Sequence, residues 1–500
     1  MTENVISKNQ LLFGIAITFL FSWFFNTLLF DAAPVVVNCV WLGMVACCSF
    51  VILSFRRRVP LQALLIPALL TASFLMQFLF VLRMPYNFSW HDLGGFDSLE
   101  DNIINGGHLG IIRHIVKSGG LPSVNPMLAQ YKDYYHPPLF HVVQAIFLKC
   151  NLWLGITLEA ALENLQIPTL FASSLCLWII WRILHQLRFS RHGQWIGMSF
   201  AALQPAFFIY GATLNNDIFS LLFIFLTILY TLQWMEAPSL RCILPISLSI
   251  GLGMATKLSL ALIAIPVGFV FAIRFFQNLS QWKSYLRQFS LFLLICAPLG
   301  LGWQLYQLFV FQVPLNQIPL PAATLNVGHL SISMRFGIPD GAVVRSLFYS
   351  GIRKTDYNVW FQTLKTALFD EQTLYPLGSF MWYMSYLLTA LFAVLCGIAV
   401  LCFLRFLLQR KSPLPPLPRI FLGMYSLVLM GSYLLFCFQY PYVCTFNFRY
   451  IFPFLLLGAI ALASFFQKPA LSGRLILFPL FSFNILSCIV YGTYLFGKTL

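Results

Sequence analysis

Apolar runs of about twenty residues recur along the whole chain, and short polar stretches separate them. The runs are continuously apolar and do not alternate with polar residues, which predicts helices long enough to cross a hydrocarbon core rather than strands. The segments that fit lie near residues 11–30, 35–55, 61–82, 166–187, 195–213, 217–235, 242–256, 259–275, 288–310, 379–406, 419–438, 451–466 and 474–495. The pattern predicts an all-α polytopic membrane protein with about 13 transmembrane helices.

Composition supports this class. Hydrophobic residues make up 59% of the chain, charged residues only 9%, and the mean hydropathy is +0.81, which excludes an ordinary soluble domain. The net charge of +15 could suggest a nucleic-acid partner, but its placement argues against one. With the N-terminus inside, the inner side carries 17 Lys and Arg and only two acids, Glu3 and Glu236, whereas the outer side carries 13 of each. We therefore expect no nucleic acid, and a plasma (inner) membrane location with the active face periplasmic or extracellular.

Two long segments, 84–165 and 311–378, fall on the predicted outer side. The first holds seven of the fifteen acidic residues, between Asp92 and Glu163. Within it, Pro138–Ile156 is apolar, but counting it as a crossing would move Arg182 to the outside, so we expect an interfacial or re-entrant helix there. The predicted division of this single integral membrane domain is 1–83 (N-terminal helices), 84–165 (first outer loop), 166–310 (transmembrane core), 311–378 (second outer loop) and 379–500 (C-terminal helices).

Asp92 is the first candidate for chemistry. It follows the third predicted span by about ten residues, so we expect it near the membrane surface. A carboxylate there can accept a proton from a hydroxyl or coordinate a metal. His91 precedes it, and Gly94-Gly95 after it permit a close backbone approach to a ligand. The same residues also fit an ordinary turn, so residue type alone leaves both interpretations open.

His136 and His141 flank the sequence Pro137-Pro138-Leu139-Phe140 at the end of this charged region. The prolines predict an extended entry followed by a helix with proline in its first turn. Contact with a phosphate or metal and simple interfacial anchoring both fit the two histidines.

Three charged residues stand at or between predicted spans. Asp217 lies at an outer helix N-terminus, where helix capping alone could explain an acid. Lys257 is the only charged residue between Arg241 and Arg274, and a charge within the membrane usually faces a cavity or partner, so we expect an anion contact. Arg449 stands at the outer end of a span, where snorkelling to the surface is the alternative.

These groups suit a long-chain lipid phosphate whose tail lies in the bilayer and whose headgroup meets a carboxylate base. A transporter could use the same residues, although transporters more often place their charges at mid-membrane in broken helices.

The order of several motifs resembles the GT-C superfamily of membrane glycosyltransferases, and within it the branch of protein O-mannosyltransferases and bacterial lipid A sugar transferases. The resemblance covers roughly residues 60–455, with the first large outer loop at its start. Its motifs are Tyr135-His136-Pro137-Pro138-Leu139, Leu214-Asn215-Asn216-Asp217, Gly251-Leu252-Gly253-Met254-Ala255-Thr256-Lys257, Thr363-Leu364-Lys365-Thr366-Ala367-Leu368-Phe369-Asp370-Glu371 and Phe448-Arg449-Tyr450.

The resemblance implies an inverting transfer of a sugar from a polyprenyl-phosphate donor to a lipid, glycan or protein acceptor on the non-cytoplasmic face. It implies Asp92 as general base, with the donor site formed by Asn216, Asp217, His136, Lys257 and Arg449, of which Lys257 and Arg449 bind the phosphate. No cofactor follows with certainty, and a divalent metal would be held by Asp92 and Asp217. The family usually has its catalytic loop after the first span, whereas here two more spans precede it. The alternatives are a transporter or flippase of a lipid-linked or amphipathic solute, and an enzyme of the O-antigen ligase or polymerase type.

Overall fold

The computed structural model describes residues 8–55, 60–87, 106–128, 133–315, 317–345, 347, 356–370, 378–409, 414–468 and 471–497. Within these ranges the regular structure is helical, apart from one isolated bridge between Asn326 and Tyr442. The α-helices are α1 (Lys8–Leu28), α2 (Pro34–Phe55), α3 (Leu61–Arg83), α4 (Gly107–Ser118), α5 (Leu139–Trp153), α6 (Leu158–Glu163), α7 (Gln166–Gln186), α8 (Arg191–Ala201), α9 (Pro205–Ala212), α10 (Asp217–Glu236), α11 (Leu240–Met254), α12 (Ala264–Gln277), α13 (Trp282–Phe311), α14 (Ile332–Phe336), α15 (Gly341–Arg345), α16 (Val359–Phe369), α17 (Ser379–Leu408), α18 (Pro416–Gln439), α19 (Phe454–Phe465) and α20 (Leu471–Gly497). The 3₁₀ helices are η1 (Leu258–Ile263), η2 (Leu279–Gln281), η3 (Ala323–Leu325), η4 (Val443–Thr445) and η5 (Phe448–Ile451).

In the described ranges, nine helices are long and apolar enough to cross a membrane, or ten if the segment from η4 to α19, bent by 44°, is one span. The all-α polytopic class is thus confirmed, whereas the count of about thirteen is not. The shortfall lies where predicted spans are helical but short. Within the described side chains, the apolar part of α1 runs only from Phe13 to Leu28, α11 has 15 residues, and the segment near 195–213 is split into α8 and α9. Pro205 starts α9, and a proline disfavours helical backbone in the residue before it, which explains this break.

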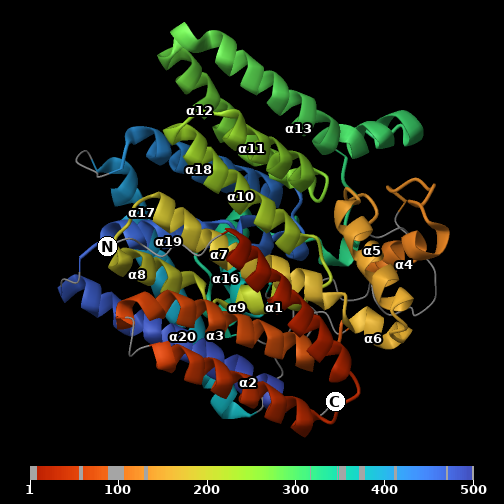
Figure 1. The fold of residues 1–500 in the computed structure, drawn as a ribbon, viewed down its shortest axis with the longest axis vertical. Helices are drawn as coiled ribbons and strands as arrows, with labels where there is room; N and C mark the ends of the chain where they lie inside the picture. Colours follow the sequence, from red (N-terminus) through yellow and green to blue (C-terminus); the bar gives the residue numbers. More distant parts are fainter. Residues whose placement is uncertain are drawn as a thin grey trace.

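The helices form one bundle, with α7, α9 and α16 near the middle of the view in Figure 1. Helix α10 packs on α7 and α11, α11 packs on α13, and α19 packs on α8 and α17. All eight residues of α9 are buried, whereas peripheral helices such as α2, α13 and α17 expose large apolar side chains. Continuous apolar surface on the outer helices is what a bilayer requires of a helical membrane protein.

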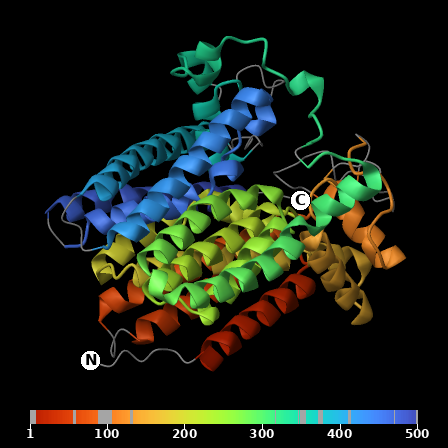
Figure 2. The ribbon, with the colours of Figure 1, turned by 90° about the horizontal axis from the view of Figure 1, so that it is seen from above.

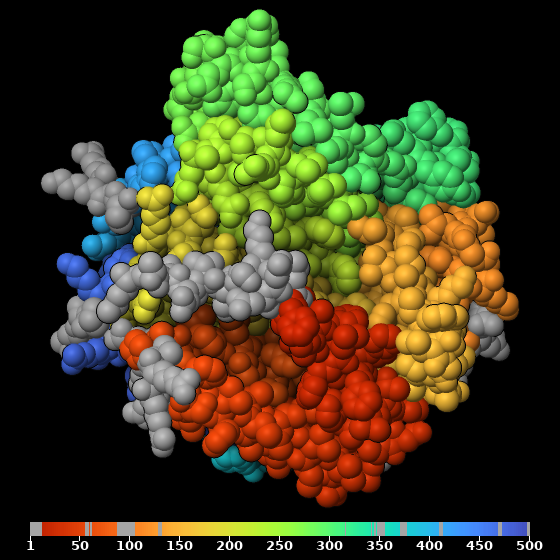
Figure 3. Space-filling view, in the orientation of Figure 1, coloured from red at the N-terminus to blue at the C-terminus, as the bar shows by residue number. Residues whose placement is uncertain are grey.

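Helices α4, α5 and α6, in orange in Figure 2, lie at one end of the bundle. Helices α4, α5 and α6 form a projecting lobe, orange in Figure 3, beside the green C-terminal end of α13. The ring of Tyr134 packs edge-on against Trp303 of α13, with centroids 5.5 Å apart. Helix α5 is shorter than the candidate spans, and whether it is interfacial or re-entrant stays a prediction.

Helix α16 lies within the second predicted outer loop, 311–378. Eight of its eleven residues are buried, and it packs against α9, η5, α14 and α17. The second long segment therefore returns into the bundle and places its C-terminal end among the helices that carry the charged candidates.

Candidate active site

Asp217 is the first residue of α10, and its side chain is only 6% exposed. The preceding turn is fixed by Asn215, whose Oδ1 accepts a hydrogen bond from the Asp217 backbone N–H at 2.9 Å. This side-chain bond satisfies one of the amide groups that a helix N-terminus leaves without an intrahelical partner. An acid in the first turn also interacts favourably with the helix dipole. The sequence therefore builds a fixed position for this carboxylate at the end of a candidate span.

Lys257 lies in the short turn between α11 and η1 and points back toward the start of α10. Its Nζ is hydrogen-bonded and ion-paired to Oδ1 of Asp217, and its side chain is 11% exposed. The end of α11 packs closely on its neighbours, because a Cβ on Gly253 would clash with Leu260 and lie 2.9 Å from Cβ of Phe223. Glycine at this position therefore permits the close packing of α11 just before the lysine turn.

Arg449 reaches the same carboxylate from a third element, the short helix η5. Its Nη1 lies 3.6 Å from Oδ2 of Asp217, and its side chain is 11% exposed. Asn447 starts η5, and its Oδ1 accepts a hydrogen bond from the Arg449 backbone N–H at 2.9 Å. The ring of Tyr450 faces both cations, 5.3 Å from Nζ of Lys257 and 5.0 Å from Cζ of Arg449.

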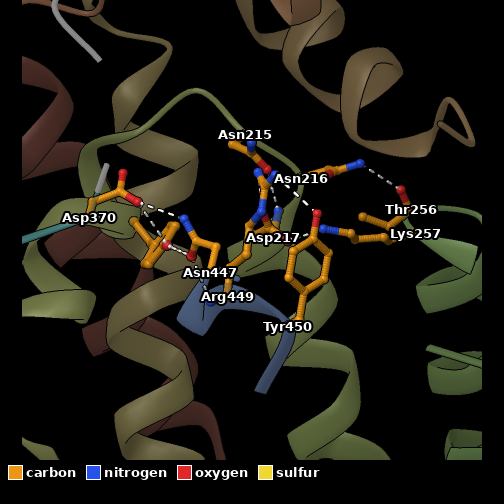
Figure 4. Close-up of polar contacts among 10 residues, drawn as sticks. Asn215, Asn216, Asp217, Thr256, Lys257, Asp370, Asn447, Arg449 and Tyr450 are labelled. Carbon is orange, nitrogen blue, oxygen red and sulfur yellow. Dashed lines mark hydrogen bonds and ion pairs between the residues drawn. The ribbon is translucent and has the colours of Figure 1, made fainter. Parts of the chain in front are cut away.

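Figure 4 shows Arg449 between Asn447 and Asp370 on one side and Asp217, Lys257 and Tyr450 on the other. We call Asp217, Lys257, Arg449 and Tyr450 the charged cluster. It contains one carboxylate and two cations at the N-terminal end of a long helix, so its own charges favour an anion. A guanidinium and an ammonium together offer the donors that phosphate oxygens prefer.

Two hydrogen bonds hold the turn that contains His136 next to this cluster. The indole N–H of Trp303 on α13 donates to the carbonyl of Tyr135 at 3.2 Å. On the other side of the turn, the backbone N–H of Leu139 donates to the carbonyl of Ala255, at the end of α11, at 3.0 Å. The histidine turn is thereby fixed between α13 and the segment that carries the cluster's lysine.

Burial, together with the charges of Lys257, His108, His141 and Arg449, holds the pKa of His136 well below its ordinary value. A neutral imidazole can still donate one N–H to a phosphate oxygen while adding no further charge next to the two cations. The position is therefore consistent with the phosphate contact that the sequence leaves open for this histidine.

The depressed pKa of His136 predicts a pH dependence of stability. Between the folded and unfolded pKa values the unfolded chain binds the proton and the folded protein does not. The contribution of His136 to stability therefore falls as the pH drops below about 6.5 and is constant above it. In thermal unfolding of the detergent-solubilised protein, we expect a lower midpoint at pH 5 than at pH 7.5, and a smaller difference in His136→Gln. An identical difference in the variant would contradict the assignment.

The other predicted residues have different positions. His141 is fully buried behind the site, and its Nε2 is hydrogen-bonded to Nδ1 of His108 at 2.8 Å. The side chain of Asn216 donates to the carbonyl of Thr256 at 3.1 Å, so it ties α10 to the lysine turn. The structure thus brings His136, Asp217, Lys257 and Arg449 together, with Asn216 supporting them. His141 is linked to His136 through His108, whose ring stacks on both histidines. His91 and Asp92 lie outside the described residues.

Sequence reasoning missed two buried residues next to the cluster. Asp370 is completely buried, and its Oδ1 accepts hydrogen bonds from Tyr210 Oη at 3.3 Å and from Asn447 Nδ2 at 3.2 Å. Asp370 belongs to a motif of the family resemblance, which was the one available signal for it. Asn447 directly precedes the Phe448-Arg449-Tyr450 motif, and a neutral amide between aromatic residues carries no signal of its own.

In the part of the chain that the structure describes, no group of three His, Cys, Asp or Glu side chains is arranged to hold a metal ion. The carboxylate of Asp217 contacts two cations, which is a poor environment for a divalent metal. Two apolar surface hollows, of about 410 and 400 Å³, also lie apart from the cluster, since none of its residues lines either one. The described side chains therefore favour an anion over a metal.

Residues 135–303 match the family model described as "Dolichyl-phosphate-mannose-protein mannosyltransferase". The matched range is about one third of the chain and includes His136, Asp217 and Lys257 but not Arg449. Its two ends meet in space, because the hydrogen bond from Trp303 joins the carbonyl of Tyr135. The match confirms the resemblance to GT-C membrane glycosyltransferases.

Among curated proteins, no relative matches the chain. Among solved structures, the chain is similar to ArnT from Cupriavidus metallidurans bound to undecaprenyl phosphate. The identity is 13%, the TM-score is 0.35, and the match covers 82% of this chain and 77% of that one.

Proposed function

We propose that the protein is a membrane glycosyltransferase that takes a sugar from a polyprenyl-phosphate donor and transfers it, with inversion, to an acceptor on the non-cytoplasmic face. The observation that carries the proposal is the convergence of Lys257 and Arg449, from separate segments, on Asp217 at a helix N-terminus. The matched family description supports it, because it names a polyprenyl-type phosphate sugar as donor.

The charge balance of the reaction gives the cluster a catalytic role. The bond between the anomeric carbon and the donor phosphate oxygen breaks, and the phosphate leaves with one more negative charge than it had as a diester. The acceptor oxygen forms the new bond and gives its proton to a base, for which we propose Asp92. Lys257 and Arg449 interact more strongly with the departing phosphate than with the bound donor, and such differential binding lowers the barrier.

Asp217 has a supporting role in this scheme. It holds both cations in position before the donor arrives, so the protein does not spend binding energy on ordering two flexible side chains. Its place at the end of a candidate span, rather than in the middle, favours the enzyme over the transporter alternative.

An assay in proteoliposomes distinguishes the two functions. We would supply polyprenyl-phosphate sugar with a radiolabelled sugar, add membrane extract as a source of acceptor, and separate lipid-linked from transferred label by chromatography. The proposal predicts transferred label with release of polyprenyl phosphate in equal amounts. Label that stays on the polyprenyl lipid but changes leaflet would instead identify a flippase.

A further inference from the structure

The last turn of α16 is buried among helices distant in sequence, and its carbonyl groups have side-chain partners. Gln204 donates to the carbonyl of Ala367 at 3.3 Å, and the hydroxyl of Tyr491 donates to the carbonyl of Leu368. The final carbonyls of a helix have no intrahelical partners, so a buried helix end needs such donors. These two bonds give partners to buried carbonyls at the end of α16, and Asp370 follows directly after this helix.

Asp370 has an unusual backbone conformation for its residue type. Its φ of 54° and ψ of −150° lie in a region that glycine adopts readily and that other residues adopt at a cost. The side chain at this position is completely buried. The interactions of the Asp370 side chain must therefore offset the free-energy cost of this backbone conformation.

The carboxylate of Asp370 connects to the charged cluster through one residue. Its Oδ1 accepts from Nδ2 of Asn447, and Oδ1 of Asn447 accepts from the backbone N–H of Arg449. The hydroxyl of Tyr210 bridges the pair, 3.3 Å from Asp370 Oδ1 and 3.0 Å from Asn447 Oδ1. Asp370 therefore orients the side chain of Asn447, and Asn447 in turn holds the backbone of Arg449.

A second contact joins the same two segments. The hydroxyl of Thr366, one turn earlier on α16, accepts a hydrogen bond from the backbone N–H of Phe448 at 2.8 Å. The end of α16 thus holds the consecutive residues Asn447, Phe448 and Arg449. Helix α16 belongs to the second long segment. The position of Arg449 therefore depends on how this part of the segment packs.

We propose that Asp370 is a positioning residue of the donor site: through Asn447 it fixes the backbone of Arg449 so that the guanidinium meets the lipid phosphate. This inference rests on the proposed function, since it takes the ligand of Arg449 to be a polyprenyl phosphate. It assigns to the second long segment a role in donor binding. The carboxylate acts through the asparagine and does not itself contact the donor.

Four variants of the full-length protein in detergent test this inference. Asp370→Gly removes the carboxylate and suits the backbone angles, whereas Asp370→Asn keeps an oxygen that can accept both hydrogen bonds. Tyr491→Phe is the matched control, because it removes a bond to the same turn of α16 but has no link to Asn447. Arg449→Met is the reference for loss of the phosphate contact. The readouts are the dissociation constant for undecaprenyl phosphate and the thermal unfolding midpoint.

We expect Asp370→Gly to weaken binding about tenfold, as the loss of one or two well-placed hydrogen bonds does. Asp370→Asn and Tyr491→Phe should bind as the wild type does, even where their unfolding midpoints fall. The positioning role is overturned if Asp370→Gly binds undecaprenyl phosphate normally while Arg449→Met does not. It is also overturned if Asp370→Asn binds the lipid as weakly as Asp370→Gly. In both cases the proposed function stands. If Arg449→Met also binds normally, the proposed donor site itself is overturned.

Discussion

Replacing Lys257 with methionine weakens binding of polyprenyl phosphate by about 10- to 100-fold, because a charge-assisted hydrogen bond contributes about 1.5–3 kcal/mol. Methionine keeps much of the apolar length of lysine, so the change removes the charge with little change in packing. Equilibrium binding of labelled undecaprenyl phosphate to the detergent-solubilised protein measures the effect. Sugar transfer should fall at least as much, since the lost contact is also needed in the transition state.

The chain offers a matched control in Lys365→Met. Lys365 is also buried and also pairs with an aspartate, Asp356, at 2.9 Å, but this pair does not include any residue of the charged cluster. Both variants leave a carboxylate without its lysine and should lower the unfolding midpoint. Only Lys257→Met should lose donor binding. If both variants lose donor binding equally, the loss comes from general destabilisation and not from a missing phosphate contact.

Replacing Asp92 with asparagine lowers kcat for sugar transfer by about 10²- to 10⁴-fold, the range in which a general base contributes. Asparagine has a similar shape but cannot take the proton of the acceptor. Donor affinity should be unchanged, because the proposed phosphate site is built by Lys257 and Arg449. Steady-state kinetics with saturating donor measure kcat, and undecaprenyl phosphate binding measures the donor site separately.

Asp97→Asn serves as the control for this prediction, because it removes another carboxylate from the same loop. It should leave kcat near the wild-type value. Retained transfer by Asp92→Asn, or an equal loss in Asp97→Asn, would remove the base assignment without affecting the phosphate site.

The sequence predicted the class of protein and part of the site for clear physical reasons. Uninterrupted apolar runs mark helices in a membrane, whatever their packing. Lys257 was identifiable because a lone charge between apolar segments is costly, and the structure places it on Asp217. The number of spans was less predictable, because the length of an apolar run does not show whether its helix is continuous. The run near 195–213 is broken before Pro205 into α8 and α9.

The rest of the site depended on tertiary structure. Asp370 lies in a polar stretch next to Glu371, so local composition alone predicts a solvated loop. It is buried because α16 docks into the bundle, where Tyr210 and Asn447 meet it from segments more than 70 residues away. The partner of His141 could likewise not be read from the sequence, because His108, to which it is hydrogen-bonded, lies 33 residues earlier on another helix.

The most direct test of the central claim is a structure of the protein with bound polyprenyl phosphate. The account predicts phosphate oxygens about 3 Å from Nζ of Lys257 and from the guanidinium of Arg449. His136 should lie beside them, and the lipid chain should lead into the membrane. A phosphate bound elsewhere, with the pair of cations still closed on Asp217, would contradict the account.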